Sequence, residues 1–412
     1  MDRAEGGVAT IEAPLVLETN AAEAIAQRIL AEQRAAMETL HIGLGPAELA
    51  LEPGDRLTFA EEVFEIVRIE DSDVREMELR RTHNGVAPML SGVDPSAPQP
   101  PQIAPTPVFA ILDIPLLPGN EDDDRPLAAV FASPWVGVHD LYAGATQTLR
   151  ATASAPAIIG ELLWDLWPGP VDRWDEGNVV RVRLYNGAIV SVTRDDVLSG
   201  ANVFAIEADG EWEIIQAAHC ELIEPGIYEL RTFLRGRQGT LHAMAAPHPV
   251  GARIVKLDQR LTRVGVGAHE WGEALEFVVP PAAATSASNR AARGSLTMPH
   301  ASLRPWAPAH LCARRSASGD VAISWVRCAR IGGDSWGLGE PPLGFPAEGY
   351  VLEILDSGLP IQTLSTAVPS FNYSAAAQTT DFGSLPGSLH IRVAQIGESG
   401  ATGLNTELTI TL

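Results

Sequence analysis

The first apolar pattern along the chain predicts one long helix near the N-terminus. Between residues 15 and 40, small and aliphatic side chains recur at helical spacing, at Ala22, Ile25, Ala26 and Ile29. Asn20 is a suitable N-cap, and Glu23 stands three residues later, as in a capping box. We expect no second helix of this length.

Alternating apolar and polar positions after this helix predict strands. The segments 41–59, 61–71 and 77–82 have this pattern, and a Pro-Gly-Asp turn at 53–55 separates strand-like runs. We therefore expect a hub-like α+β domain over residues 1–92. The proline-rich text "VDPSAPQPPQIAPTP" at 93–107 predicts an extended linker after it.

Turn signals between apolar runs predict successive hairpins in the next region. The pairs Asn186-Gly187, Asp209-Gly210 and Pro225-Gly226 each separate two strand-like runs. We expect an antiparallel meander, within a central β domain over residues 108–277. One segment of it, 155–169, predicts a short helix that a proline stops.

The remaining chain predicts a linker and a β-sandwich. Residues 278–295 are low in complexity and favour a bridge between domains. Short, regularly spaced strand segments follow, so we expect a fibronectin-III-like sandwich over 296–412, with Trp325 and Tyr350 in its core. The predicted fold class is mainly β with a minor α+β part, in several domains.

Charge and cysteine content exclude several classes of protein. The chain has 52 acidic and 29 basic residues, a net charge of −23, which repels nucleic acid and anionic lipid alike. Three cysteines are too few for a disulfide framework. The sequence has no run of 18 apolar residues and no secretion-signal pattern at its start, so we expect synthesis in the cytoplasm and no membrane insertion.

The stretch "FLRGRQGTLHA" at 233–243 raises the question of phosphate binding. A P-loop needs Gly-Lys-Ser/Thr followed by a helix, and here the lysine is missing and two prolines follow. We interpret the stretch as a structural turn. Gly236 and Gly239 would permit a left-handed backbone, while Arg235 and Arg237 would pair with carboxylates.

This stretch belongs to a longer text that resembles a known family. The motifs "GEWEIIQ", "PGIYEL", "LRGRQGT" and "VGARIVKLD", in this order, are similar to the tail-tip "megatron", or host-specificity, protein of gene transfer agents and related siphophages. The C-terminal "ISWVRCARIGGDSW" and "LHIRVAQIG" are similar to the closing domain of the same family. The resemblance covers most of residues 104–412, and the opening helix with "LALEPGDRLTF" resembles hub portions of tail proteins more weakly.

The resemblance implies a structural role at a phage or gene transfer agent tail tip. We expect a homotrimer around the tail axis, with the distal tail protein, the hub and the tail tube as partners, and contact with a bacterial surface glycan or receptor. Full-length family members carry an additional N-terminal domain similar to glycoside hydrolases, which has no counterpart in these 412 residues. We therefore expect either a fragment of a longer protein or a short tail-tip protein with a separate partner.

Tryptophan residues are the candidates for glycan contact. Trp336 in "GGDSWGLG" and Trp306 would stack on sugar rings from exposed loops of the projecting sandwich, and burial at a domain interface is the competing interpretation. Two other classes stay open: a glycan- or peptidoglycan-cleaving enzyme subunit, and a stand-alone carbohydrate-binding protein.

Four other groups of residues favour a structural interpretation over a site. Carboxylates near tryptophans in 161–176 would be needed for glycoside cleavage, with Glu161 and Asp172 as test positions. The acidic run 120–127 lacks the spacing of an EF-hand. His310, Cys312 and Cys328 lack a fourth zinc ligand, and the neighbours His139 and Asp140 on one strand point to opposite faces. We expect no catalytic residue, metal or cofactor.

Overall fold

The chain is divided into two compact units, Met1–Pro101 and Gln102–Leu412. The computed structural model describes residues 19–45, 50–72, 74–83, 104–337, 339–344, 347–398 and 400–411, so most of the predicted linker 93–107 lies outside the described residues. Strands account for 45% of the structure and helices for 9%, which confirms the predicted fold class. Within the described residues, no helix has the length and apolarity needed to cross a membrane.

The first unit contains helix α1 (Thr19–Ala35) and one antiparallel sheet. The sheet has the order β1-β4-β3-β2 and consists of β1 (Thr39–Leu44), β2 (Arg56–Phe59), β3 (Glu62–Asp71) and β4 (Arg75–Arg81). Period-two alternation places the large apolar residues of β3 and β4 on one face, where the buried ones are Phe64, Ile66, Met77 and Leu79.

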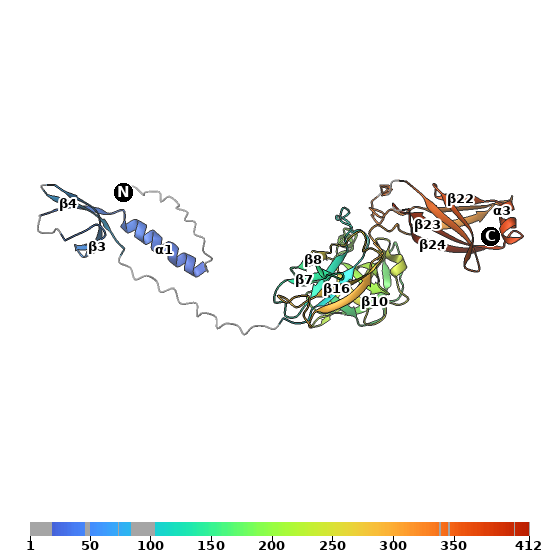
Figure 1. Cartoon of the computed structure of the whole chain (residues 1–412), viewed down its shortest axis with the longest axis horizontal. Coiled ribbons are helices and arrows are strands. Elements are labelled where there is room, and N and C mark those ends of the chain that lie inside the picture. The colour runs from blue at the N-terminus through green and yellow to red at the C-terminus, as the bar shows by residue number, and fades with distance from the viewer. Residues whose placement is uncertain are drawn as a thin grey trace. The chain divides into compact units, whose positions relative to one another are not determined.

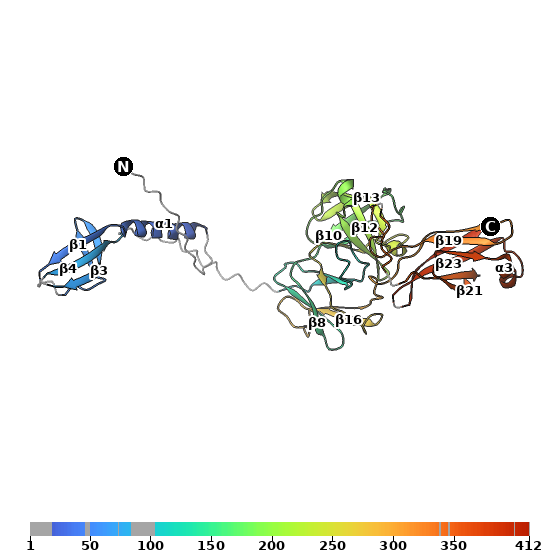
Figure 2. The ribbon, with the colours of Figure 1, turned by 90° about the horizontal axis from the view of Figure 1, so that it is seen from above.

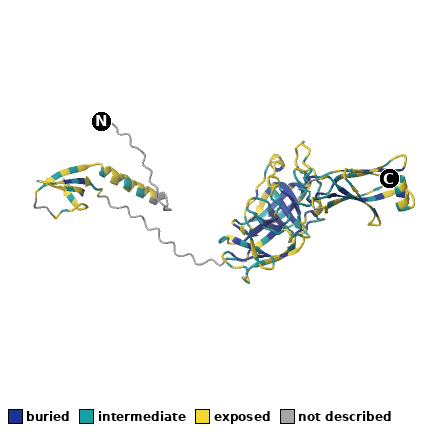
Figure 3. Cartoon of the chain, turned by 45° about the horizontal axis from the view of Figure 1, so that its top comes forward, coloured by how far each residue is buried: buried dark blue, intermediate teal, exposed yellow. Residues whose placement is uncertain are grey.

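Helix α1 packs little against this sheet. Figures 1 and 2 show it running out from the end of the sheet, and most of its ribbon is exposed in Figure 3. Its predicted apolar stripe is only half-buried at Ile25 and Ile29. The helix therefore relies on local signals, such as the Arg28–Glu32 pair one turn apart, and the side chain of Asn20, its predicted cap, lies outside the described side chains.

A closed six-stranded barrel forms the centre of the second unit (Figure 2). Its strands follow the order β10-β13-β12-β11-β14-β9 and are β9 (Ile159–Leu162), β10 (Asp175–Leu184), β11 (Val203–Ala208), β12 (Glu211–Glu224), β13 (Ile227–Arg237) and β14 (Arg253–Lys256). Closure leaves the barrel without an unpaired edge. Aliphatic and aromatic side chains fill it, including Leu162, Val182, Phe204 and Phe233.

Two of the three predicted hairpins are confirmed. β11 and β12 are joined at Asp209-Gly210, and β12 and β13 at Pro225-Gly226. The hairpin at Asn186-Gly187 is wrong, because the described residues 185–193 form no strand and β10 instead pairs with β9 and β13. The chain after this turn leads into the short helix α2 (Arg194–Leu198), whose capping box is closed by Thr193.

The predicted helix in 155–169 is also wrong, because this segment contains strand β9. Ile158 faces the barrel interior and Ile159 faces a second core outside it, and both are buried. An apolar run that is buried on both faces does not alternate, so its pattern does not distinguish a strand from a buried helix.

Two small sheets flank the barrel. One has the order β15-β6-β5 and consists of β5 (Val108–Leu112), β6 (Leu127–Phe131) and β15 (Thr262–Arg263). The other has the order β17-β16-β7-β8 and consists of β7 (His139–Ala143), β8 (Thr148–Ala153), β16 (Ala274–Val279) and β17 (Ala292–Thr297). β6 is buried throughout because Leu127 and Ala129 face the barrel while Ala128 and Val130 face the second sheet.

The predicted linker 278–295 is a hairpin within this domain. Val278 pairs with Arg293 and Val279 with Ala292, and both valines are fully buried. Only the loop 280–291 between them keeps the small-residue composition that led to the linker prediction. Composition indicated an irregular loop here, and the buried valines before it show that the loop does not separate two domains.

The C-terminal part of the second unit is a two-sheet sandwich (Figure 1). The sheets have the orders β18-β19-β22 and β21-β20-β23-β24, with strands β18 (Ala309–Arg315), β19 (Val321–Val326), β20 (Tyr350–Asp356), β21 (Leu359–Thr366), β22 (Ser370–Tyr373), β23 (Ser388–Ile396) and β24 (Thr402–Thr411). Trp325 and Tyr350 lie in the core as predicted, edge to face with ring centroids 5.2 Å apart. The sequence pattern missed β18, β21 and the helix α3 (Ala375–Phe382). The likeness to fibronectin type III stays a prediction.

Residues 298–308, here called the strap, connect β17 to the sandwich. The barrel side binds the strap through hydrogen bonds from the Ala301 amide to Asp113 (2.9 Å) and from the Ser302 hydroxyl to the Asp124 carbonyl (2.8 Å). Arg304 binds both carboxylate oxygens of Glu211, at 3.0 and 2.8 Å. The strap is thus held along its length, in contrast to the expected projection of the sandwich on a low-complexity bridge.

Aromatic packing and the sandwich complete the attachment of the strap. The His300 ring stacks on Trp271 with centroids 3.6 Å apart. Trp306 lies against Gly239, and the Leu404 amide of the sandwich donates to the Pro305 carbonyl (3.0 Å). The barrel domain and the sandwich are therefore joined by packing as well as by the peptide chain.

We predict that Gly239→Ala loosens the sandwich from the barrel. Gly239 has φ +73°, and a Cβ there would overlap the ring of Trp306. Gly251→Ala is the matched control, because Gly251 has φ +86° and a Cβ added to it would meet no atom within 4 Å. In both variants the left-handed alanine lowers the free energy of unfolding by roughly 1–2 kcal/mol. Only Gly239→Ala should expose the strap to limited proteolysis. Equal protease resistance of the two variants would contradict the packing argument.

We predict that the buried carboxyl of Asp113 makes the folded protein less stable as the pH rises from about 4 to 6. Burial raises the pKa of its carboxyl to about 6, against the lowering effect of the backbone donors Ala301 and His300. The folded chain thus holds this proton between pH 4 and 6 while the unfolded chain releases it, so stability falls over this window by on the order of 2–3 kcal/mol. Asp113→Asn should match the wild type near pH 4 and exceed it at pH 7.5 in urea titrations.

The control for this prediction is Asp123→Asn, which should behave in the opposite way. Hydrogen bonding by Arg125 lowers the pKa of Asp123 to about 2. Its contribution is present at neutral pH and is lost as the pH falls through the range between 4 and 2. A pH-independent difference between Asp113→Asn and the wild type would refute the assignment of Asp113.

Candidate functional site

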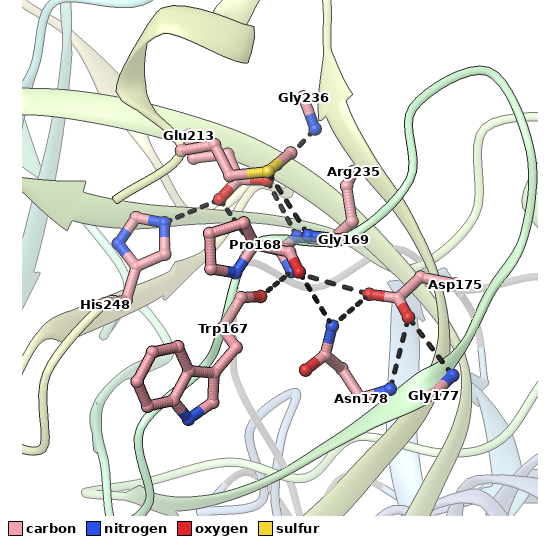
Figure 4. A network of polar contacts seen from close by, with 11 residues as sticks. Trp167, Pro168, Gly169, Asp175, Gly177, Asn178, Glu213, Arg235, Gly236 and His248 are labelled. Carbon is pink, nitrogen blue, oxygen red and sulfur yellow. Dashed lines mark hydrogen bonds and ion pairs between the residues drawn. The ribbon is translucent and has the colours of Figure 1, made fainter. Parts of the chain in front are cut away.

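The stretch 233–243 lies at one end of the barrel, where Arg235 is the centre of a buried charge network (Figure 4). The Arg235 guanidinium donates two parallel hydrogen bonds to Glu213, both of 2.8 Å. It donates a third to the Trp167 carbonyl (2.9 Å) and lies 3.6 Å from Asp175. The side chains of Arg235 and Glu213 are fully buried, and Asp175 is nearly so. A forked guanidinium suits this planar two-point recognition better than lysine would.

Two further groups complete the network around the carboxylates. His248 contacts Glu213 at 2.6 Å, and the Gly236 amide donates to the same carboxylate at 3.0 Å. Asp175 accepts hydrogen bonds from the Asn178 amide and side chain. Burial alone would raise the pKa of Glu213, but the hydrogen bonds from His248 and Arg235 outweigh it and lower the pKa. Glu213 therefore stays ionised and needs Arg235.

The backbone turns after Arg235, so Arg235 and Arg237 bind different parts of the second unit. Gly236 has φ +58° and Gly239 has φ +73°, both in the left-handed region. Arg235 lies inside the barrel end, whereas Arg237 binds Asp334 of the long loop after β19, at 2.6 Å from Nη1. The Asp334 carboxylate also accepts from the Gln238 amide at 2.7 Å. The arginine-glycine stretch thus links the barrel to that loop.

A cleft with both polar and apolar walls lies beside this link. It has a volume of about 830 Å³, and it is lined by the β5–β6 loop, the segment after α2, the end of β13, residues 257–263 and the loop 330–336. Trp336 is on its wall and is 46% exposed. The guanidinium of Arg237 lies over the Trp336 ring, 5.0 Å from its centroid. The structure thereby brings together Arg237 and Trp336, which sequence reasoning had placed in separate motifs.

Trp306, the other tryptophan predicted for glycan contact, is buried. It is only 5% exposed and packs against Gly239 in the strap. The structure agrees with the competing interpretation, burial at a domain interface. The prediction that Trp306 contacts a glycan from the surface is therefore wrong, and Trp306 is a packing residue.

The carboxylates considered for glycoside cleavage mostly have partners within the chain. Glu161 pairs with Arg183 at 2.9 Å, and Asp165 accepts from the Val250 amide at 2.9 Å. Glu176 pairs with Arg194. Asp175 belongs to the buried network, and Asp172 lies at a turn with φ +57°. These contacts account for the carboxylates through packing and turn formation.

The remaining candidate groups are dispersed in the described structure. In the acidic run, Asp123 pairs with Arg125 at 2.8 Å. His139 is buried and contacts the Pro280 carbonyl at 3.0 Å. Cys220 is buried, Cys312 exposed and Cys328 half-buried. Among the described residues, no group of three or more histidine, cysteine, aspartate or glutamate side chains is arranged to hold a metal ion.

Sequence reasoning missed the partners that give the arginines their role. Glu213, His248 and Asp334 are separated from the stretch 233–243 along the chain or lie on another strand. No local spacing marks them, because they meet the arginines only after β12 and β13 pair and the loop 330–336 folds back.

Two family models match parts of the chain. Residues 1–71 match a family described as putative phage tail protein. Residues 157–255, which span most of the barrel and the network, match a family described as Rcc01698-like, C-terminal. The first match supports a phage tail protein, and the second is consistent with a relative of gene transfer agent proteins.

The other comparisons add little. No curated protein matches the chain. Among solved structures, the rat CD45 extracellular region, domains d3-d4, is similar at 11% identity over 38% of this chain and 72% of its own, with a TM-score of 0.19. A likeness this weak carries no argument.

We predict that Arg235→Met strongly destabilises the second unit. The variant leaves the ionised Glu213 buried without the guanidinium that binds it. Removing one partner of a buried ion pair lowers the free energy of unfolding by about 3–5 kcal/mol. Arg183→Met is the matched control, because Arg183 pairs with Glu161 at a half-exposed site, where such a pair contributes less than about 1 kcal/mol. Urea unfolding followed by tryptophan fluorescence measures both. Similar midpoints for the two variants would show that the network contributes little.

Proposed function

We propose that this protein is a structural component of a phage or gene transfer agent tail tip, which takes part in tail assembly and in contact with the host surface. The observation that carries the proposal is the match of residues 1–71 to a putative phage tail protein family. The motifs of the second unit, which resemble the closing region of tail-tip proteins, support the same assignment. In this role the protein belongs to the virion and acts beside other tail proteins.

The architecture suits a mechanical role. In the second unit, the barrel is closed, the strap is bonded along its length, and arginine–carboxylate pairs join distant segments. Such a body transmits load between neighbours without rearranging. We propose three copies around the tail axis, with the distal tail protein, the hub and the tail tube as neighbours, because a closed ring satisfies every interface between copies.

Surface contact is the second half of the proposal. The cleft beside Trp336 is concave and combines polar with apolar side chains, and its volume is typical of small-molecule sites. A glycan-cleaving role has less support, because Glu161, Asp165, Asp175 and Glu176 each have a partner within the chain. We therefore propose that the protein binds and holds, and that it is not an enzyme.

We predict that the full chain assembles with tail proteins. Purified protein should have a mass three times 43.8 kDa by light scattering, and cross-linking of intact particles should join it to the distal tail and tail-tube proteins. Incubation with peptidoglycan or capsule should release no reducing ends. A monomer that is absent from particles would contradict the proposal.

The enzyme alternative has its own diagnostic result. If the chain released reducing ends and Glu161→Gln or Asp172→Asn abolished the release, the protein would be a glycan-cleaving subunit. Glu224→Gln, which changes an exposed carboxylate outside residues 161–176, is the control for effects of substitution as such.

A further inference from the structure

The cleft beside Trp336 has an aromatic wall that an anchored arginine contacts. Asp334 holds Arg237 through its carboxylate and its carbonyl, at 2.6 and 3.0 Å, and Arg237 lies over the Trp336 ring. The indole thus has a fixed neighbour and still exposes 46% of its surface. Burial raises the pKa of Asp334, while Arg237 opposes this effect. The exposed part of the indole offers an apolar surface to a ligand.

The cleft is lined by equal numbers of positive and negative side chains, which disfavours an anionic ligand. Three arginines, Arg237, Arg263 and Arg330, line it together with three carboxylates, Glu121, Asp258 and Asp334. Phosphate or polyanion sites concentrate positive charge. Here the local charge is balanced and the whole chain carries −23, so an anionic ligand would be repelled at a distance and gain little in the cleft.

The uncharged polar groups of the lining are two serines, Ser199 and Ser335, and four side-chain amides, which suit hydroxyl-rich ligands. Asn120, Gln216, Gln238 and Gln259 line the cleft, and Asn120 and Gln259 are exposed. A side-chain amide offers both a donor and an acceptor, and therefore matches two neighbouring hydroxyl groups of a sugar. A sugar ring also has a face of C–H bonds that stacks on an indole. The volume of about 830 Å³ lies in the range of ~300–1,000 Å³ found for small-ligand pockets.

We propose that this cleft binds a neutral oligosaccharide, with one sugar ring stacked on Trp336 and its hydroxyl groups bound by the amides and carboxylates of the wall. The inference deepens the host-contact half of the proposed function and rests on that function only for the source of the sugar. The protein–sugar contact itself stands on the residues of the cleft.

The test is calorimetric titration of the full chain with neutral trisaccharides built on glucose, galactose, mannose and N-acetylglucosamine. At least one should bind, and trigalacturonate, an anionic trisaccharide, should not. Trp336→Ala should weaken binding about tenfold, which corresponds to ~1.4 kcal/mol. Trp336→Phe should retain most of the affinity. Trp167→Ala should bind as the wild type does, because Trp167 is 58% exposed and lies outside the cleft.

A second lining position protects the test against misfolding of one variant. Gln259→Ala changes an exposed amide of the cleft and should weaken the same trisaccharide while leaving the thermal midpoint unchanged. Full binding by both Trp336→Ala and Gln259→Ala, or no binding of any neutral sugar at millimolar concentration, would overturn the inference. So would self-association of the chain that Trp336→Ala abolishes without any sugar binding, since the cleft would then receive a second copy.

The outcomes separate this inference from the proposed function. Sugar binding through Trp336 by a chain that never enters particles would support the cleft and refute the tail role. Normal incorporation into particles by a chain that binds no sugar would do the reverse.

Discussion

The second unit depends on the neutralisation of Glu213 inside the end of the barrel. A carboxylate that is fully buried and ionised must be matched, and Arg235 matches it with two hydrogen bonds of 2.8 Å. Arg235 also reaches the Trp167 carbonyl, and Glu213 also contacts His248. Because these partners come from four separate segments, the network fixes which segments close the barrel end, and it thereby fixes the course of the chain from Gly236 onward.

The choice of arginine follows from the same constraint. Of the 29 basic residues, Lys256 is the only lysine. A guanidinium holds a planar fork toward carboxylates and carbonyls and also stacks on aromatic rings, whereas an ammonium is a strongly hydrated point charge. The chain uses both properties: Arg304 forks onto Glu211 in the strap, and Arg237 stacks on Trp336. Both of these arginines join segments that are far apart along the chain.

Sequence reasoning predicted what local pattern controls. The hairpins at Asp209-Gly210 and Pro225-Gly226 carry their turn residues beside the strands that they join, and Trp325 and Tyr350 are large aromatics in alternating strands. It failed at β9 and β16, where burial on both faces or small-residue loops erase the alternation. The cleft could not be predicted beyond Trp336, because its walls come from separate segments between residues 116 and 336 that only tertiary folding brings together.

The strong net negative charge of the chain limits the kinds of contact that the charge-balanced cleft can make at a distance. A surface with a net charge of −23 raises a repulsive potential toward anionic polymers, and ionic strength near 0.15 M limits its reach to about 8 Å. Contacts with any negatively charged partner must therefore be short-ranged, through hydrogen bonds, apolar packing and paired charges. The same holds for a ligand, which gains affinity only from groups that touch it. The charge-balanced cleft beside Trp336 meets this condition for an uncharged ligand, because contacts through shape and hydrogen bonding lose nothing to the field of the protein.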